Sequence, residues 1–117
     1  MRVLLLDDNA ELRDFLVAVL NENGVDAIGV ATAQEALEKF NQEKFDGFVV
    51  DSTMGESDGV GLANQVRATK LGKNVPVLLM SEITTSLARR IAQNSNCKFI
   101  AKPFRLAEFV DEVRALR

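Results

Sequence analysis

The sequence predicts an α/β fold in which a five-stranded parallel sheet lies between two layers of helices, a three-layer α/β/α sandwich. Two observations predict it. Five short apolar runs, each long enough for one strand, alternate along the chain with segments whose apolar residues recur at helical spacing. Continuous apolar runs are typical of parallel strands buried on both faces, with helices as the crossovers between them. We expect residues 1–117 to form a single domain, because this length suits one core.

The first half of the chain predicts three strands and two helices. Residues 3–6 form the first strand, residues 25–30 the second and residues 48–50 the third. The helix after the first strand carries five apolar residues at helical spacing, namely Leu12, Phe15, Leu16, Val19 and Leu20. Asn9 is its candidate N-cap and Gly24 its end. The helix after the second strand has a capping box and three core positions, in order Thr32, Glu35, Ala36, Leu37 and Phe40.

The second half predicts two further strands and three helices. Residues 52–59 form a polar loop in which Asp58 is a candidate cap for a helix that ends near Gly72. That helix presents three apolar residues to the core, Leu62, Ala63 and Val66. The elements that follow are a strand over residues 77–80, a weaker helix over 84–94 with Leu87 and Ile91 inward, and a strand over 99–101. In the last helix four apolar residues recur at helical spacing, namely Leu106, Phe109, Val110 and Val113. Arg105 occupies the cap position of the last helix, so that helix is poorly capped.

Polar side chains follow four of the strands at the point where each strand ends. Asp7 and Asp8 follow the first strand, Asp51 the third, Ser81 the fourth and Lys102 the fifth. Ligands of open α/β sheets bind beyond the carboxyl ends of the strands, where the winding direction reverses. Carboxylates gathered there repel one another unless a cation lies between them, and Mg²⁺ prefers such oxygen ligands together with water and phosphate. The sequence therefore predicts one site for a divalent metal and a phosphoryl group.

The chemistry available at this site is phosphoryl transfer to a carboxylate. A carboxylate is a competent nucleophile toward phosphorus, and a metal, a lysine and a hydroxyl suffice to neutralise the transferred charge. The chain has no histidine, so a mechanism that needs an imidazole of its own is excluded. Each residue also has a structural interpretation, because Asp-Asp-Asn after a strand often serves only as a turn and helix cap. The coincidence of all five at successive strand ends favours the functional interpretation.

Composition and charge exclude several other classes. The net charge of −3 argues against direct nucleic-acid binding, and no apolar stretch approaches the length of a membrane span. A single cysteine, Cys97, excludes an internal disulfide, and the first strand begins so close to Met1 that we expect no signal peptide and a cytoplasmic location. Residues 84–117 carry seven Lys or Arg against three Asp or Glu. That positive region is either a solvated helical face or a docking surface.

The whole chain resembles a known family, the receiver domains of two-component response regulators in their single-domain chemotaxis-type form. The motifs that carry the resemblance are Leu6-Asp7-Asp8-Asn9, Val50-Asp51-Ser52-Thr53-Met54 with Asp58-Gly59, Met80-Ser81, and Lys102-Pro103-Phe104. Each motif alone is weak, but their order and spacing together are specific. The resemblance implies a flavodoxin-like strand order of 2-1-3-4-5. It also implies a protein that is no enzyme beyond catalysing its own aspartyl phosphorylation and dephosphorylation.

The resemblance also assigns the acidic residues. Asp51 looks like the phosphoacceptor, which receives its phosphoryl group from a histidine of a sensor histidine kinase or a histidine phosphotransfer protein. Asp8 and Asp51 would bind Mg²⁺ directly, together with the backbone carbonyl of Thr53, and Asp7 would act largely through water. Lys102 would pair with the phosphoryl group.

The remaining family positions concern switching. Ser81 would hydrogen-bond a phosphoryl oxygen, and Phe99 matches the aromatic residue that turns inward as Ser81 moves. The Lys102–Pro103 bond is expected to be cis. Phosphorylation would then reshape the surface of residues 82–117, where a downstream protein target would bind.

Two departures from the family pattern leave an alternative open. Gly55 stands where the family usually has proline, and Glu82 follows Ser81 where a small residue is usual. A degenerate receiver-like adaptor that binds proteins without phosphorylation would fit these departures. An aspartyl-phosphate hydrolase is disfavoured because Asp-x-Asp is missing after the first strand, and a nucleotide-binding domain because neither a P-loop nor G-x-G-x-x-G is present.

Overall fold

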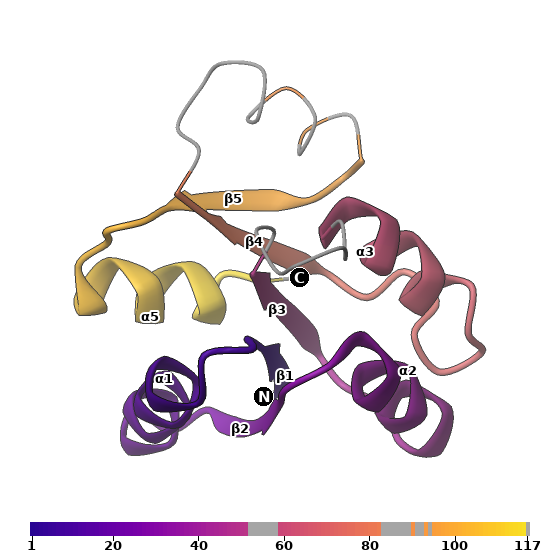
Figure 1. Ribbon diagram of the computed structural model, residues 1–117, viewed down its shortest axis with the longest axis horizontal. Helices are drawn as coiled ribbons and strands as arrows, with labels where there is room; N and C mark the ends of the chain where they lie inside the picture. Colours follow the sequence, from indigo (N-terminus) through magenta and orange to yellow (C-terminus); the bar gives the residue numbers. More distant parts are fainter. Residues whose placement is uncertain (52–58, 83–89, 91–92, 94, 117) are drawn as a thin grey trace.

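A computed structural model describes residues 1–51, 59–82, 90, 93 and 95–116. Its elements, in chain order, are β1 (Arg2–Leu6), α1 (Ala10–Glu22), β2 (Asp26–Val30), α2 (Ala33–Gln42), β3 (Gly47–Asp51), α3 (Gly59–Arg67), β4 (Val77–Ser81), β5 (Lys98–Ala101) and α5 (Leu106–Arg114). The strands form a five-stranded parallel sheet in the order β2-β1-β3-β4-β5. Helices α1 and α5 lie on one side of the sheet, and α2 and α3 lie on the other (Figure 1). The predicted fold class and strand order are confirmed.

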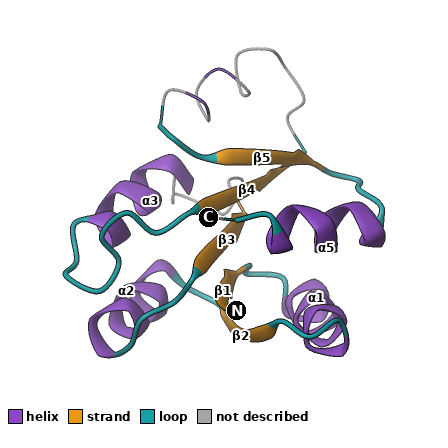
Figure 2. Cartoon of the chain, turned by 180° about the vertical axis from the view of Figure 1, so that it is seen from behind, coloured by secondary structure: helices purple, strands orange, loops and turns teal. Residues whose placement is uncertain are grey.

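Each face of the sheet has its own hydrophobic core, because successive side chains of a strand point to opposite faces. Leu4 and Leu6 of β1 pack with Phe40 of α2 on one face. Leu5 packs with Leu16 of α1 on the other face, where α5 contributes Phe109, Val110 and Val113. The view from behind shows the same two helix pairs on either side of the strands (Figure 2). Burial on both faces explains why the strands read as continuous apolar runs.

The helix caps of the first half are those that the sequence predicts. Asn9 caps α1 by accepting a hydrogen bond from the backbone N–H of Leu12 at 3.1 Å. Thr32 and Glu35 form the capping box of α2, in which the Thr32 hydroxyl oxygen accepts from the Glu35 N–H at 3.1 Å. Arg105 precedes α5 without a side-chain cap. The α1 cap also fixes the loop that follows β1, so it bears on the site below.

Two residues of the apolar stripes are exposed. Phe15 of α1 is 51% exposed and Leu106 of α5 is 40% exposed, although both belong to apolar stripes at helical spacing. The apolar face of each helix is wider than the part that packs on the sheet. In α1, Leu16 and Leu20 are buried at the centre of this face, and Phe15 lies at its edge. Helical spacing alone therefore does not separate the residues that the sheet covers from Phe15 and Leu106 at the edge of each stripe.

Two smaller predictions have different outcomes. Helix α3 ends at Arg67, earlier than the predicted stop near Gly72, because the chain turns back over the helix end, where the Thr69 N–H bonds to the Val66 carbonyl at 3.0 Å. The candidate cap Asp58 and most of the predicted helix over 84–94 lie outside the described residues. Among the helices that the structure describes, none combines the length and hydropathy needed to cross a bilayer.

Candidate functional site

The carboxyl ends of four strands bring the predicted site residues to one edge of the sheet. Asp7 directly follows β1, Asp51 ends β3, Ser81 ends β4 and Lys102 directly follows β5. The strand register aligns Leu6 with Val50, and Ser81 with Ala101, so the residues that follow lie side by side. Since β1 pairs with both β2 and β3, the winding direction reverses at β1. The acidic residues lie at this reversal.

Three carboxylates converge there. Asp7, Asp8 and Asp51 each offer a carboxylate oxygen, and these oxygens all lie within 4.8 Å of one another. Asp7 is 1% exposed and Asp51 6% exposed, whereas Asp8 is open to solvent. Carboxylates held this close in a partly buried site repel strongly unless positive charge lies between them. The cluster therefore favours binding of a cation.

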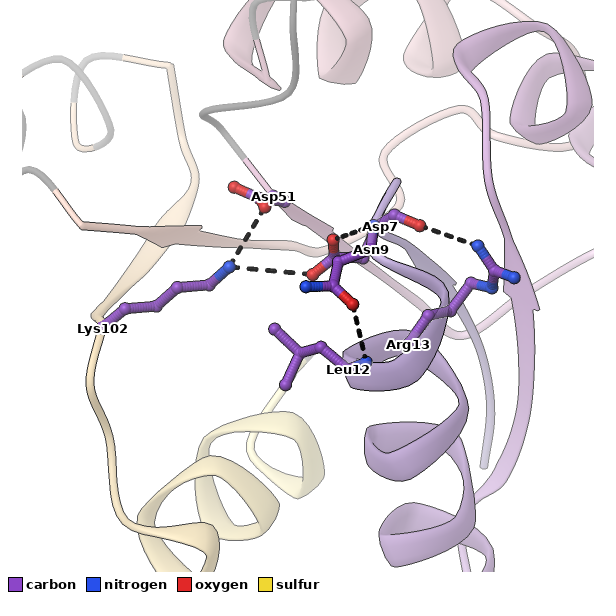
Figure 3. A network of polar contacts seen from close by, with 6 residues as sticks. All are labelled: Asp7, Asn9, Leu12, Arg13, Asp51 and Lys102. Atoms are coloured by element: carbon purple, nitrogen blue, oxygen red, sulfur yellow. Dashed lines mark hydrogen bonds and ion pairs between the residues drawn. The ribbon is translucent and has the colours of Figure 1, made fainter.

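Lys102 supplies part of that positive charge. Its Nζ lies 3.0 Å from Asp51 Oδ2 and 3.7 Å from Asp7 Oδ2, and its side chain is 14% exposed (Figure 3). The Lys102 backbone N–H donates to the Ser81 carbonyl at 2.7 Å, and the Lys102–Pro103 peptide bond is cis. One ammonium against three carboxylates leaves an excess of negative charge. That excess suits a divalent ion.

The two carboxylate oxygens of Asp7 differ in their surroundings. Asp7 Oδ1 accepts a hydrogen bond from the Asn9 N–H at 2.9 Å. Asp7 Oδ2 is buried and has no hydrogen-bond partner in the part of the chain that the structure describes. Burial raises the pKa of the Asp7 carboxyl above its ordinary value; the Asn9 hydrogen bond and Lys102 oppose this, and Asp51 and Asp8 add to it. Buried polar atoms normally have partners, so this oxygen fits a site built for a hydrated Mg²⁺.

The other residues singled out from the sequence lie at or near this edge, or outside the described residues. Ser81 is 2% exposed, and Glu82 beside it is exposed. Phe99 of β5 is half-buried against the core on the side of α2 and α3. Thr53 and Gly55 lie outside the described residues.

The family model of the response regulator receiver domain matches residues 3–114. The chain belongs to this family. The response regulator MprA of Mycobacterium leprae (strain TN) is 31% identical over 118 residues, which cover 99% of this chain and 50% of MprA. The chain thus spans about half the length of the first curated relatives that it matches.

Solved receiver domains have the same fold. The receiver domain of the Francisella response regulator 1452 superposes with a TM-score of 0.86 at 28% identity, covering 97% of this chain and 93% of that chain. The receiver domain of the sensor histidine kinase PA1611 from Pseudomonas aeruginosa PAO1, with a magnesium ion coordinated in its active site cleft, superposes with a TM-score of 0.84 at 22% identity. Coverage in that case is 98% of this chain and 95% of that chain. At 22% identity, the similarity to the PA1611 receiver domain shows only that the two chains share a fold.

Two features of this receiver domain were missed in the sequence. The first is Arg13, whose guanidinium reaches the backbone carbonyl of Asp7. Its place one helical turn after the cap Asn9 is the signal that could have indicated it. The second is an open hollow of about 540 Å³ beside the site. Among the described residues, its wall includes Phe15, Glu82, Lys102, Pro103, Phe104 and Leu106.

Proposed function

We propose that this receiver domain, formed by residues 1–117, accepts a phosphoryl group on Asp51 from a phosphohistidine of a sensor histidine kinase or a histidine phosphotransfer protein. The observation that carries the proposal is the convergence of two further carboxylates, those of Asp7 and Asp8, within 4.8 Å of the acceptor Asp51, which also contacts the Lys102 ammonium at 3.0 Å. Asp51 suits the role of acceptor because it ends β3 at the carboxyl edge of the sheet and lies beside Lys102. Asp7 and Asp8 complete the acidic cluster.

The transfer exchanges one bond for another. An oxygen of the Asp51 carboxylate attacks phosphorus, the P–N bond to the donor histidine breaks, and the imidazole nitrogen keeps the electron pair of that bond. The product is an aspartyl phosphate on Asp51. Lys102 neutralises charge on the transferred oxygens, which would otherwise be repelled by the carboxylates.

A bound Mg²⁺ would supply further charge neutralisation at the phosphoryl oxygens. Asp8 and Asp51 are the residues proposed to hold it directly, with the carbonyl of Thr53 as the third protein ligand. Asp7, whose Oδ2 is buried without a hydrogen-bond partner in the described part of the chain, would hold it through water. The donor set of carboxylate and carbonyl oxygens is the one that Mg²⁺ prefers.

Phosphorylation also provides a switch. The aspartyl phosphate adds charge and strong acceptor oxygens beside Ser81 and Lys102, so the Ser81 hydroxyl and the Lys102 ammonium are drawn to it. Movement at Ser81 would open space for Phe99 and alter the surface of residues 82–117. A downstream protein target that prefers the altered surface would then bind more tightly.

The donor protein is the proposed occupant of the hollow beside the site. The hollow is continuous with the acceptor because Lys102, which contacts Asp51, also forms part of its wall. Phe15 of α1 and Leu106 of α5 expose apolar surface there. A donor covering these residues would carry its phosphohistidine to the edge where Asp51 lies.

Acetyl phosphate provides the test. In the presence of Mg²⁺ the intact mass should rise by one phosphoryl group, and Asp51→Asn and Asp51→Ala should abolish the gain. Modification of Asp51→Ala would assign the acceptor to another residue and refute the proposal.

The adaptor alternative rests on Gly55, which lies outside the described residues, and on Glu82, an exposed carboxylate in the wall that also contains Lys102. Titration with Mg²⁺ in the absence of a phosphodonor distinguishes it from the receiver. A working receiver should show saturable changes confined to the acidic edge, whereas an adaptor should show none.

A further inference from the structure

Arg13 of α1 makes a contact that none of the functions above uses. Its Nη1 donates a hydrogen bond to the backbone carbonyl oxygen of Asp7 at 3.1 Å (Figure 3). The side chain is only 18% exposed, and its Nε lies 3.7 Å from Oδ1 of the exposed Asp14. The guanidinium therefore binds the chain at the end of β1.

The carbonyl that Arg13 binds belongs to the peptide unit between Asp7 and Asp8. A peptide unit is planar, so a bond that fixes its carbonyl also fixes the direction in which the Asp8 Cα leaves it. The Asp7 N–H, on the other side, donates to the Val30 carbonyl at 3.2 Å. Asp8 is exposed to solvent, so its side chain is not held by packing in the core. The position of the Asp8 carboxylate therefore depends on the peptide unit that precedes it.

Gly29 of β2 makes room for the Arg13 side chain. A Cβ at Gly29 would lie 3.0 Å from Cγ and 3.1 Å from Cδ of Arg13, and 3.2 Å from Cγ2 of Val17. These distances are shorter than ordinary carbon contacts, so any larger residue would press on the arginine stem. Because Gly29 has no side chain, the stem of Arg13 can pack over β2 while its guanidinium reaches the end of β1.

We propose that Arg13 is a positioning residue for the metal site: it holds the Asp7–Asp8 peptide so that the Asp8 carboxylate stays directed at Asp51. This inference rests on the proposed function, in which Asp8 and Asp51 hold Mg²⁺. Groups that orient metal ligands from outside the ligand shell contribute substantially to metal affinity. Here the oriented group is a backbone carbonyl next to a proposed ligand.

Charge and position predict opposite effects when Arg13 is replaced. A guanidinium near a cation site repels the cation, so loss of charge alone would strengthen Mg²⁺ binding. Loss of the hydrogen bond frees the Asp7–Asp8 peptide and would weaken Mg²⁺ binding. The sign of the change in affinity therefore separates the two roles.

The experiment compares Mg²⁺ dissociation constants, measured by calorimetry without a phosphodonor. Arg13→Met keeps the aliphatic stem and removes the donor, and its Kd should rise about tenfold. Arg13→Lys restores a charged donor and should recover part of the affinity. Gly29→Ala keeps the arginine but adds a Cβ that displaces its aliphatic stem, so the Kd of this variant should also rise. As a control, Asp14→Asn should stay within about twofold of the wild type, because exposed charges are screened.

The outcomes separate this inference from the function on which it rests. An unchanged or lower Kd in Arg13→Met, with normal binding by the wild type, overturns the role of Arg13 alone. Absence of Mg²⁺ binding by the wild type refutes the proposed function instead. Metal-free amide NMR spectra check that each variant is folded. If Arg13→Met is not folded, Gly29→Ala decides, and a wild-type Kd in that variant overturns the inference.

Discussion

Lys102 Nζ lies 3.0 Å from Asp51 Oδ2, although the two residues are 51 positions apart and β4 separates their strands. The pair is mostly shielded from solvent, and Asp7 Oδ2 lies 3.7 Å from the same nitrogen. The ammonium thus faces two buried carboxylates at once. Its role in transfer can be separated from its effect on metal binding.

Replacement of Lys102 by methionine should slow phosphorylation by acetyl phosphate about a hundredfold at saturating Mg²⁺, the typical cost of losing one preorganised donor. Affinity for Mg²⁺ should stay equal or increase, because a competing positive charge is removed. Stopped reactions analysed by intact mass give the rate, and calorimetry gives the affinity. Lys102→Arg, which keeps the charge, is the matched control. A wild-type rate in Lys102→Met would exclude a role for the ammonium in transfer.

Asp7 should make the stability of the metal-free protein depend on pH. Burial raises the pKa of its carboxyl in the folded protein above the ordinary value of 3.8, so the folded state binds this proton more tightly than the unfolded state. The contribution of Asp7 to stability is therefore most favourable below 3.8 and is lost as pH rises through the raised pKa. Asp7→Asn should increase the free energy of unfolding at neutral pH, and the increase should shrink in acid. Urea unfolding without Mg²⁺ at several pH values measures this difference; a constant difference would contradict it.

Saturating Mg²⁺ should reverse the order of stability, so that the wild type has a larger free energy of unfolding than Asp7→Asn. The wild type gains binding free energy from the metal, whereas Asp7→Asn has lost part of the acidic cluster and gains less. The same urea series at neutral pH provides the comparison.

Glu82 should hinder anionic donors. Its exposed carboxylate lies in the wall that contains Lys102, so it repels acetyl phosphate as the donor approaches. Glu82→Ala should be phosphorylated about twofold to threefold faster at low ionic strength, and the advantage should fade as salt screens the charge. Glu82→Gln separates charge from size, and Glu108→Gln on α5 controls for net charge. Equal rates in Glu82→Ala and the wild type would remove Glu82 from the mechanism.

Phe15 should matter for a protein donor and not for a small one. Phe15 is 51% exposed and lines the hollow beside the site, so Phe15→Ala removes donor-facing surface without opening the core. Transfer from a phosphorylated histidine phosphotransfer protein should become about tenfold less efficient, the loss of about 1.4 kcal/mol of binding free energy. The rate with acetyl phosphate should be unchanged. Asn41→Ala on α2 is the control on the opposite side of the sheet, and equal loss with both donors would contradict the docking role.

Local signals in the sequence are sufficient for much of this architecture. The apolar runs predict the strands, and Asn9 and Thr32 predict the helix starts, because capping and strand burial depend on residues close together in the chain. The positions of Asp7, Asp51, Ser81 and Lys102 at strand ends follow from the same pattern. The order of the strands came from the family resemblance, since apolar periodicity alone does not determine which strands are neighbours.

Tertiary packing alone decided the rest. Asp7 and Asp8 are adjacent in sequence, yet one is 1% exposed and the other is open to solvent, because the chain leaves β1 between two neighbouring strands. Phe15 belongs to an apolar stripe but lies beyond the part that the sheet covers. The hydrogen bond from Arg13 to the Asp7 carbonyl, at the end of β1, depends on the space left by Gly29 in the neighbouring strand β2. A local pattern specifies which elements form and which residues end them, whereas exposure and side-chain reach depend on neighbours that only the folded chain supplies.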